Sequence, residues 1–483
     1  MIGIAYLAIA AAIGLHRVEE TGPIWPDSPR YANAGILVRD WVLSDQWLRP
    51  IPFAIDRYAH SPGFSAPYHP PGFPAALGGW FLITGISHES ARLFIALSWG
   101  FAAWLFYGIN RELLFNKAAS FAAGLLLLTM PQIAIWSRDT MSEIPSLVPL
   151  FVATLFWLRW LRTSRPIDGL LALGFAIAAF FFRVTTAGIL PGLVVFGACV
   201  GGWNRRHYLL VAAGSCIYLA LAAGWVAFAS RYSTHEISAD GKGTVSLAAA
   251  IAYFELCLPQ ALMSGTAALA ALGLIRGIWS RENPPAIGFW LAWLASYTAF
   301  KIAVPSSLEQ RHFLTALPAL AGLSAAIFPL GAGRGKCLAW LVAIAAIGVN
   351  VWLLADCPRG VVGYQGVAEL LARSDRPGNV LLASWEDQDL LFRSRAAAPA
   401  RDRFFIRSDR TLAVRVSSYA KVAAKILATN EEDVLELIHK GRIRFIVISS
   451  ARPDQPDLRP EEMRLVERTM EAHPDLFRRI GEF

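Results

Sequence analysis

The sequence is poor in charge and in cysteine. Only 17% of its 483 residues are Asp, Glu, Lys or Arg, whereas an average soluble protein has about 25%. The five cysteines are scattered, odd in number and form no CxxC pair, so they do not indicate a metal or redox motif. We interpret them as small apolar side chains inside apolar segments.

Apolar residues, in contrast, are abundant, at 55% of the chain with a mean hydropathy of +0.44. A membrane-spanning helix needs about 20 mostly apolar residues, and such stretches recur from residue 1 to about residue 355. The sequence therefore predicts an integral membrane protein. The net charge of +8 comes from clusters between apolar runs, where membrane orientation explains them, so no nucleic-acid partner is expected.

Short basic loops predict the topology, because cytoplasmic loops carry an excess of Lys and Arg. Five such loops are placed inside: 111–117, 159–165, 205–207, 276–281 and 334–336. We interpret residues 1–15 as a short first span and not as a signal peptide, since a basic leader is lacking. The predicted spans that follow are 118–135, 143–161, 167–183, 186–203, 208–230, 256–278, 286–304, 312–331 and 337–355, after a helix at about 91–109.

This scheme has about eleven spans and leaves residues 16–71 and the tail outside. The segment 73–85 is too short to cross a bilayer, so we predict an interfacial helix there. Residues 30–47 have helical apolar spacing and predict a second one.

The chain is predicted to divide into a transmembrane domain, residues 1–355, and an extracytoplasmic α/β domain, residues 356–483. In the tail, 379–384 and 442–449 have the composition of buried strands, and 430–441 has an Asn N-cap and a closing Gly. Alternation of strand and helix predicts a small parallel sheet. The tail contains no Gly-rich phosphate loop, so its function is not indicated.

Polar side chains collect at the outer ends of the predicted spans and not in their middles, where a transporter would place them. In the first outer loop Asp27 precedes the predicted interfacial helix, whose N-terminal dipole would keep the carboxylate ionised. A solvated N-cap is the alternative. The loop ends at Tyr68-His69, where His69 could donate to a phosphate or ligate a metal.

The second outer loop carries Asp139 and Glu143, four residues apart and so on one face of a continuous helix. A carboxylate at this depth must be paired, solvated or bound to a cation. The alternative to a functional site is a solvated helix cap in which the carboxylate pairs with Arg138. Two arginines complete the set. Arg183 could meet a phosphate or extend toward the interface, and Arg311 suits a phosphate bidentately or contacts lipid headgroups.

At these residues the sequence resembles the GT-C membrane glycosyltransferases that use polyprenyl-phosphate-linked sugars, in particular protein O-mannosyltransferases and lipid A aminoarabinose transferases. The likeness covers roughly residues 20–330. Its ordered pieces are PDSPRY (26–31), YHPPGFPAALGGWFLITG (68–85), SRDTMSEIPSL (137–147) and RHFLTALPAL (311–320).

The resemblance implies a role for each matching position. Asp27 matches the first-loop acid that acts as base or organises the acceptor, and Glu143 the second-loop carboxylate, with Asp139 as its competitor. His69, Arg183 and Arg311 match positions near the lipid phosphate. Tyr31 and Tyr68 are predicted to bind substrate.

A divalent metal, Mg²⁺ or Mn²⁺, is left open by the resemblance. Its candidate ligands are Asp27, Glu143 and His69. Several relatives have two consecutive acids in the first loop, whereas Ser28 follows Asp27 here, and this departure argues against a metal.

The expected function is transfer of a sugar from a polyprenyl-phosphate donor to a lipid, glycan or protein acceptor, outside a bacterial inner membrane. No nucleotide-sugar motif is present, in keeping with a lipid donor. A transporter or flippase of lipid-linked sugars and a non-catalytic membrane scaffold are the alternatives. The scaffold predicts no convergence of Asp27 with Glu143.

Overall fold

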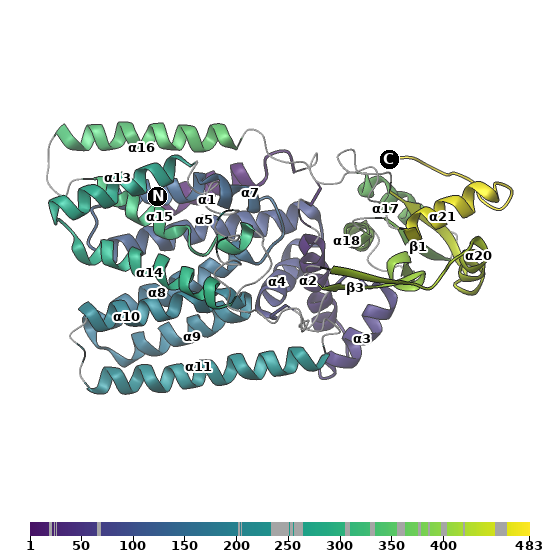
Figure 1. Cartoon of the computed structure of the whole chain (residues 1–483), viewed down its shortest axis with the longest axis horizontal. Helices are drawn as coiled ribbons and strands as arrows, with labels where there is room; N and C mark the ends of the chain where they lie inside the picture. Colours follow the sequence, from purple (N-terminus) through teal and green to yellow (C-terminus); the bar gives the residue numbers. More distant parts are fainter. Residues whose placement is uncertain are drawn as a thin grey trace.

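The computed structural model of the chain is a long helical bundle with a small α/β unit beyond one end (Figure 1). It describes residues 1–483 except 19–21, 24, 26, 65–68, 201–202, 204, 233–250, 252–254, 256–263, 305–309, 329–333, 355–362, 375–377, 385–386, 398–402, 419–420 and 450–460.

The bundle is built from apolar helices that follow the predicted spans. Their bounds are α1 (Ile2–Gly14), α2 (Asp27–Leu43), α3 (Pro50–His60), α4 (Gly72–Thr84), α5 (His88–Glu112), α6 (Lys117–Thr129), α7 (Pro131–Trp136), α8 (Glu143–Thr163), α9 (Pro166–Phe182), η2 (Val184–Ile189), α10 (Leu190–Val200), α11 (Arg205–Tyr232), α13 (Gly265–Ser280), α14 (Pro284–Ala303), η4 (Gln310–Phe313), α15 (Pro318–Ser324), η5 (Ala325–Ile327) and α16 (Arg334–Leu353). Part of the predicted span 256–278 lies outside the described residues, and α13 accounts for the rest.

The described helices include five that are long and apolar enough to cross a membrane, within α5, α8, α11, α14 and α16, and several shorter apolar ones. The chain is thus a multi-pass membrane protein, but not every predicted span is one uninterrupted helix. The predicted span 118–135 breaks at Met130, before Pro131, and the span 312–331 is divided into η4, α15 and η5. Proline at each restart, Pro131 and Pro318, lacks the amide hydrogen that a continuing helix needs.

Short helices α2 and α4 confirm the two helices predicted in the first outer loop and pack against each other. Close approach depends on glycine: a Cβ on Gly78 would lie 2.8 Å from the backbone oxygen of Gly35. A Cβ on Gly72 would lie 2.7 Å from the Phe181 oxygen, at the end of α9. These contacts hold the start of α4, and His69 just before it, against the bundle.

The bundle core is aromatic and fully buried, with Trp99, Trp290 and Trp293 among its largest side chains. Rings of Phe106 and Trp290 lie 5.1 Å apart and join α5 to α14. Between helices in lipid, such packing contributes most of the association energy, because lipid tails are as apolar as the side chains. The core therefore holds α5, α8 and α14 together.

The tail confirms the predicted strand and helix alternation. Its elements are α17 (Tyr364–Arg373), β1 (Asn379–Ala383), α18 (Asp387–Ala397), β2 (Phe405–Arg407), α19 (Ser408–Thr411), β3 (Ala413–Ser418), β4 (Lys421–Ile426), α20 (Glu431–Lys440), β5 (Ile443–Ile448) and α21 (Glu461–Ala472). Strands β2, β1 and β5 form a parallel sheet in that order, with Val380 opposite Phe405 and Phe445. Asn430 caps α20 in a capping box with Asp433, as its sequence predicts.

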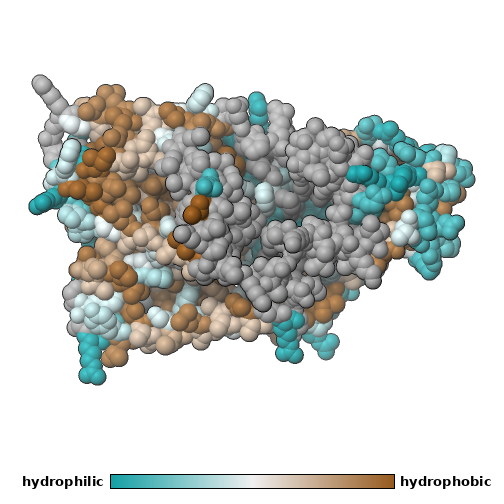
Figure 2. Space-filling model, in the orientation of Figure 1, coloured by the Kyte–Doolittle hydropathy of each residue, from teal (hydrophilic) through white to brown (hydrophobic). Residues whose placement is uncertain are grey.

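Surface colouring separates the two parts: brown, apolar residues cover much of the bundle, and teal, hydrophilic ones cover much of the tail's outer end (Figure 2). Tail helix α18 packs on α2, where the Asn33 amide donates to the Gln388 carbonyl at 2.9 Å. The proposed domain boundary near residue 355 lies outside the described residues, so the exact division stays a prediction.

Candidate active site

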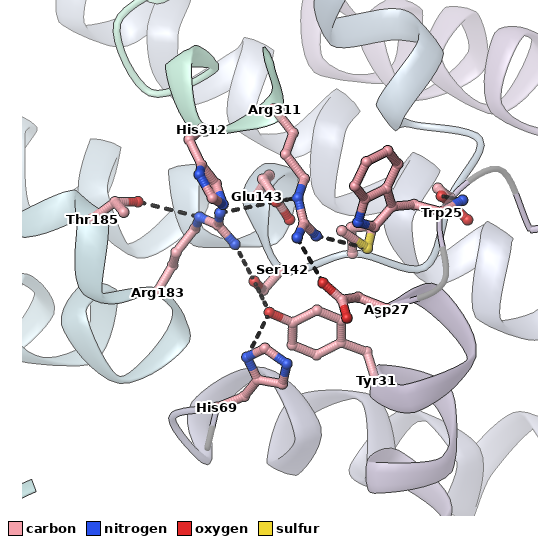
Figure 3. Close-up of polar contacts among 12 residues, drawn as sticks. Trp25, Asp27, Tyr31, His69, Ser142, Glu143, Arg183, Thr185, Arg311 and His312 are labelled. Carbon is pink, nitrogen blue, oxygen red and sulfur yellow. Dashed lines mark hydrogen bonds and ion pairs between the residues drawn. The ribbon is translucent and has the colours of Figure 1, made fainter. Parts of the chain in front are cut away.

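Four segments that are far apart in the sequence bring charged side chains together at the end of the bundle that faces the tail (Figures 1 and 3). At the centre is Arg311 of η4. Its Nη2 lies 2.6 Å from Oδ2 of Asp27, and its Nε lies 3.6 Å from Oε1 of Glu143. One guanidinium therefore bridges the carboxylates of the first and second outer loops.

A second guanidinium approaches Glu143 from the other side (Figure 3). Nη2 of Arg183 lies 2.9 Å from Oε1 of Glu143, and Nη1 donates to Ser142 Oγ at 3.0 Å. Its Nε donates to Thr185 Oγ1 at 3.2 Å. Arg183 is thus directed into the cluster, and the alternative that it extends toward the lipid interface is wrong.

A line of hydrogen bonds leads from Arg183 to His69. Ser142 Oγ donates to the Tyr31 hydroxyl at 3.1 Å, and that hydroxyl lies 3.1 Å from Nδ1 of His69. Because a guanidinium can only donate, Ser142 accepts from Arg183 and passes its own hydrogen to Tyr31. The Tyr31 hydrogen is then directed to Nδ1, which favours the His69 tautomer with its proton on Nε2.

Local sequence explains why these side chains meet. Asp27 and Glu143 each occupy the first turn of a helix, α2 and α8, where the unpaired amides and the helix dipole favour a negative charge. Arg183 is the residue at which α9 ends and η2 begins. The chain thus presents carboxylates at helix starts and arginines at helix breaks, all at one level of the bundle.

Two further bonds fasten the first outer loop to the second. Asp139 accepts a hydrogen bond from the Trp25 backbone N–H at 2.9 Å, and Thr140 N–H donates to Ser28 Oγ at 2.9 Å. The Trp25 ring also receives the Arg311 guanidinium, 5.2 Å from its centroid, in cation–π geometry. This contact of Asp139 favours an anchoring role for it, whereas Glu143 faces the arginines.

Protonation states follow from burial and charge. Burial raises the pKa of Asp27, but the charge and hydrogen bond of Arg311, with Arg30 in support, outweigh it and hold this pKa below its usual range. Burial lowers the pKa of His69 to about 3, so its imidazole is neutral at physiological pH. Burial likewise raises the pKa of Tyr31, which remains a phenol. At physiological pH Asp27 is therefore a carboxylate that can accept a proton, whereas His69 and Tyr31 are uncharged.

The donor set does not fit a resident divalent metal. Among the residues that the structure describes, no three His, Cys, Asp or Glu side chains are grouped to hold an ion. Asp27 and Glu143 each contact a guanidinium within 3 Å, and a dication would have to compete with these cations. A metal at this site therefore stays a prediction.

Most of the predicted residues are brought together. Asp27, Tyr31, His69, Glu143, Arg183 and Arg311 form one connected network, whereas Tyr68 lies outside the described residues. Their catalytic and binding roles stay predictions. The scaffold alternative expected no meeting of Asp27 with Glu143, and that expectation is not met.

Three participants were missed by the sequence analysis: Ser142, Trp25 and Arg30. Arg30 lies one turn after Asp27 and contacts its Oδ1 at 3.1 Å; an acid and a base three residues apart on a predicted helix could have indicated this pair. Ser142 and Trp25 have no such signal, because their contacts depend on how the two outer loops meet.

The fold and this cluster define a multi-pass membrane protein with a charged site at one end of its helix bundle. Residues 68–229 match the family model described as dolichyl-phosphate-mannose-protein mannosyltransferase. No curated protein matches the chain by sequence.

Solved structures share the fold over most of the chain. ArnT from Cupriavidus metallidurans in the apo state is 16% identical with a TM-score of 0.59, covering 84% of this chain and 85% of that one. The Archaeoglobus fulgidus oligosaccharyltransferase is 14% identical with a TM-score of 0.52, covering 92% and 69%. The arabinofuranosyltransferase AftD from Mycobacteria is 18% identical with a TM-score of 0.52, covering 97% and 37%.

The match of residues 68–229 to a glycosyltransferase family model, together with the fold shared with these glycosyltransferases, supports membership of the GT-C superfamily.

Proposed function

We propose that the protein transfers a sugar from a polyprenyl-phosphate donor to an acceptor on the extracytoplasmic side of the membrane. One observation carries the proposal: Arg311 and Arg183 converge on Asp27 and Glu143 in a buried cluster. Such a cluster supplies both the cations that a departing phosphate needs and a carboxylate for the acceptor. A structure of ArnT bound to undecaprenyl phosphate, 15% identical with a TM-score of 0.52, shares the fold over 92% of this chain and 89% of its own.

In the proposed reaction an acceptor oxygen attacks the anomeric carbon of the sugar. The bond between that carbon and the phosphate oxygen breaks, and the phosphate leaves with the bonding electrons. Asp27 orients the acceptor hydroxyl and takes its proton as the new bond forms. A single displacement inverts the configuration at the anomeric carbon.

Arg311 and Arg183 stabilise the negative charge that develops on the departing phosphate. A planar guanidinium matches a phosphate bidentately, and each arginine already lies within 4 Å of a carboxylate. When the donor phosphate binds, Arg311 exchanges part of its contact with Asp27 for contact with the phosphate. Asp27 is then released toward the acceptor at the moment when the donor is in place.

The extracytoplasmic assignment is supported by charge distribution. The short basic loops between the predicted spans have the excess of Lys and Arg that is expected of cytoplasmic loops. Helix α16 runs from the opposite end of the bundle to the end where the tail lies (Figure 1). The site and the tail then face the same side, outside a bacterial inner membrane.

One buried polar group in the bundle, the Asn350 amide, serves to join helices. Asn350 of α16 is fully buried and donates to Thr266 Oγ1 at 2.8 Å, while its Oδ1 accepts from Gly265 N–H at 2.9 Å. A buried amide with satisfied hydrogen bonds joins helices and does not indicate a transport path.

The test is transfer from a panel of radiolabelled polyprenyl-phosphate sugars by the full-length protein in detergent, wild type against Asp27→Asn. Wild type is expected to transfer at least one sugar, and the variant to be slower by about 100-fold or more. Equal transfer by both proteins would remove Asp27 from the proposed step. No transfer of any sugar to membrane extracts would contradict the function itself.

A further inference from the structure

One residue of the tail, Gln388 in the first turn of α18, connects the tail to the carboxylate of Asp27. The side-chain oxygen of Gln388 accepts a hydrogen bond from Nε of Arg30 at 2.7 Å. Nη1 of the same guanidinium lies 3.1 Å from Oδ1 of Asp27. The proposed transfer step gives the tail no role, whereas this line of contacts leads from the tail to the carboxylate on which that step depends.

Helix α2 binds Gln388 at two points. The Asn33 amide donates to the backbone oxygen of Gln388 at 2.9 Å, and Arg30 donates to its side chain. Asp27, Arg30 and Asn33 follow one another at steps of three residues, so they lie on one face of α2. This face therefore carries the acid, its basic partner and the contact with the tail, and Gln388 is only 6% exposed there.

Other contacts hold α18 in place without the side chain of Gln388. Phe392 is part of the bundle core, and its ring lies 6.4 Å from that of Phe81 in α4. On the tail side, Oδ2 of Asp387 lies 2.5 Å from Nε of Arg407, at the end of β2. Apolar packing therefore fixes α18 to the bundle and an ion pair fixes it to the sheet, so a change of the Gln388 side chain alone leaves the tail docked (Figure 1).

Arg30 needs a second partner to stay on Asp27. Its side chain is 29% exposed, and an ion pair at such a position is weak by itself, because ordering a long side chain costs entropy. A hydrogen bond at Nε fixes the plane of the guanidinium and directs Nη1 to Asp27. Because a guanidinium can only donate, Gln388 must present its oxygen, and this fixes the orientation of its amide.

The two oxygens of Asp27 have different guanidinium partners. Oδ2 lies 2.6 Å from Arg311, and Oδ1 lies 3.1 Å from Arg30. In the proposed reaction Arg311 turns part of its contact to the donor phosphate. Arg30 is then the cation that keeps the plane of the carboxylate fixed while the acceptor binds.

We propose that Gln388 is a positioning residue of the tail, which holds Arg30 against Asp27 and so fixes the orientation of the Asp27 carboxylate. Its effect on transfer rests on the proposed function. The energetic coupling of Gln388 to Asp27 through Arg30 does not depend on that function.

The first test is transfer kinetics of the full-length protein. Gln388→Met removes the acceptor of the Arg30 hydrogen bond at nearly constant side-chain length. We expect kcat to fall about tenfold, because misplacement of a catalytic group by about 1 Å can cost up to about 100-fold, and the KM for the donor to stay unchanged. Gln388→Glu retains an oxygen for Arg30 and should recover most of the lost kcat.

Arg395→Met is the matched control. Arg395 also joins α18 to α2, through Asp40 at 2.5 Å, but Asp40 lies more than three turns of α2 beyond Asp27. Its removal weakens the docking of the tail without touching the line from Gln388 to Asp27. Wild-type kcat is therefore expected for Arg395→Met.

The second test needs no transfer. Equilibrium unfolding in mixed micelles gives the midpoint shifts of Gln388→Met, of Asp27→Asn and of the double variant. Gln388 and Asp27 are expected to be coupled, so that the two shifts do not add, and to become additive when Arg30→Met is present as well. Arg395→Met and Asp27→Asn should be additive in every background.

Wild-type kcat for Gln388→Met, or additive shifts of Gln388→Met and Asp27→Asn, would overturn the proposal. An equal loss of kcat in Arg395→Met would also overturn it, because docking of the tail would then explain the effect. If Gln388→Met does not fold, Arg30→Met, which retains every tail residue, must show the same loss of kcat for the proposal to stand. Coupling of Gln388 to Asp27 with no transfer of any sugar by wild type would support the positioning contact and count against the proposed function.

Discussion

The guanidinium of Arg311 lies 2.6 Å from the carboxylate of Asp27, although 284 positions separate them in the chain. The same guanidinium reaches Glu143 at 3.6 Å. Removal of the bridge would leave Asp27 with Arg30 and Glu143 with Arg183, and loss of one partner from a buried ion pair costs up to about 3–5 kcal/mol.

Arg311→Gln is therefore expected to lower both stability and transfer. Thermal unfolding of the purified protein in detergent should shift downward by several degrees. The double variant Arg311→Gln with Asp27→Asn should recover part of the stability, because the buried charge that lost its main partner is gone, but none of the transfer. A double variant that is as unstable as the single one would show that Asp27 is not the partner that matters.

Glu143 and Asp139 should respond differently to substitution. Glu143→Gln removes the charge between Arg183 and Arg311 and is expected to reduce kcat by about 100-fold, in the range seen for lost electrostatic stabilisation. Asp139→Ala removes the acceptor of the Trp25 N–H and is expected to lower stability by about 1–3 kcal/mol. Steady-state kinetics with thermal unfolding on both variants makes the comparison, and a larger kcat loss for Asp139→Ala would reverse the assignment.

The pH dependence of stability should report His69. Burial lowers the pKa of this imidazole to about 3, against about 6.5 in an unfolded chain. Between these values the unfolded state binds the extra proton, so stability falls as pH decreases through this window, by up to about 1.4 kcal/mol per pH unit. Unfolding of wild type and His69→Gln from pH 4 to 7 is the measurement, and the variant should have the shallower slope.

Tyr31→Phe separates the hydrogen-bond line from the ion pairs. It retains the ring that stacks on His69 at 4.3 Å and removes the hydroxyl between Ser142 and His69. We expect a loss of about 1 kcal/mol in stability and a smaller effect on transfer than that of Asp27→Asn. Transfer by Tyr31→Phe as poor as that of Asp27→Asn would make the hydroxyl a participant in the reaction.

Chelators should not affect transfer. Asp27 and Glu143 are paired with Arg311 and Arg183, so the site does not require a dication to balance its charge. Transfer assayed with and without excess EDTA is expected to be equal. Loss of transfer with EDTA, restored by Mg²⁺ or Mn²⁺ alone, would contradict this account and support the metal that the resemblance left open.

Local patterns in the sequence determined the membrane class, the positions of most helices and the α/β alternation of the tail. Apolar periodicity, proline and capping residues act over a few positions, so α2, α4 and α20 could be predicted from their own residues. Sequence also indicated Asp27, Glu143, Arg183 and Arg311, since charges at the ends of apolar runs must be accommodated.

Only the tertiary structure decided which of these charges meet. Arg311 bridges Asp27 and Glu143, Asp139 instead anchors Trp25, and Ser142 links Arg183 to Tyr31. Ion pairs and hydrogen bonds act over about 3 Å, whereas the sequence specifies only which end of the bundle a side chain occupies. The close packing of helices at glycine and the helix breaks at Pro131 and Pro318 bring these side chains within that range of one another.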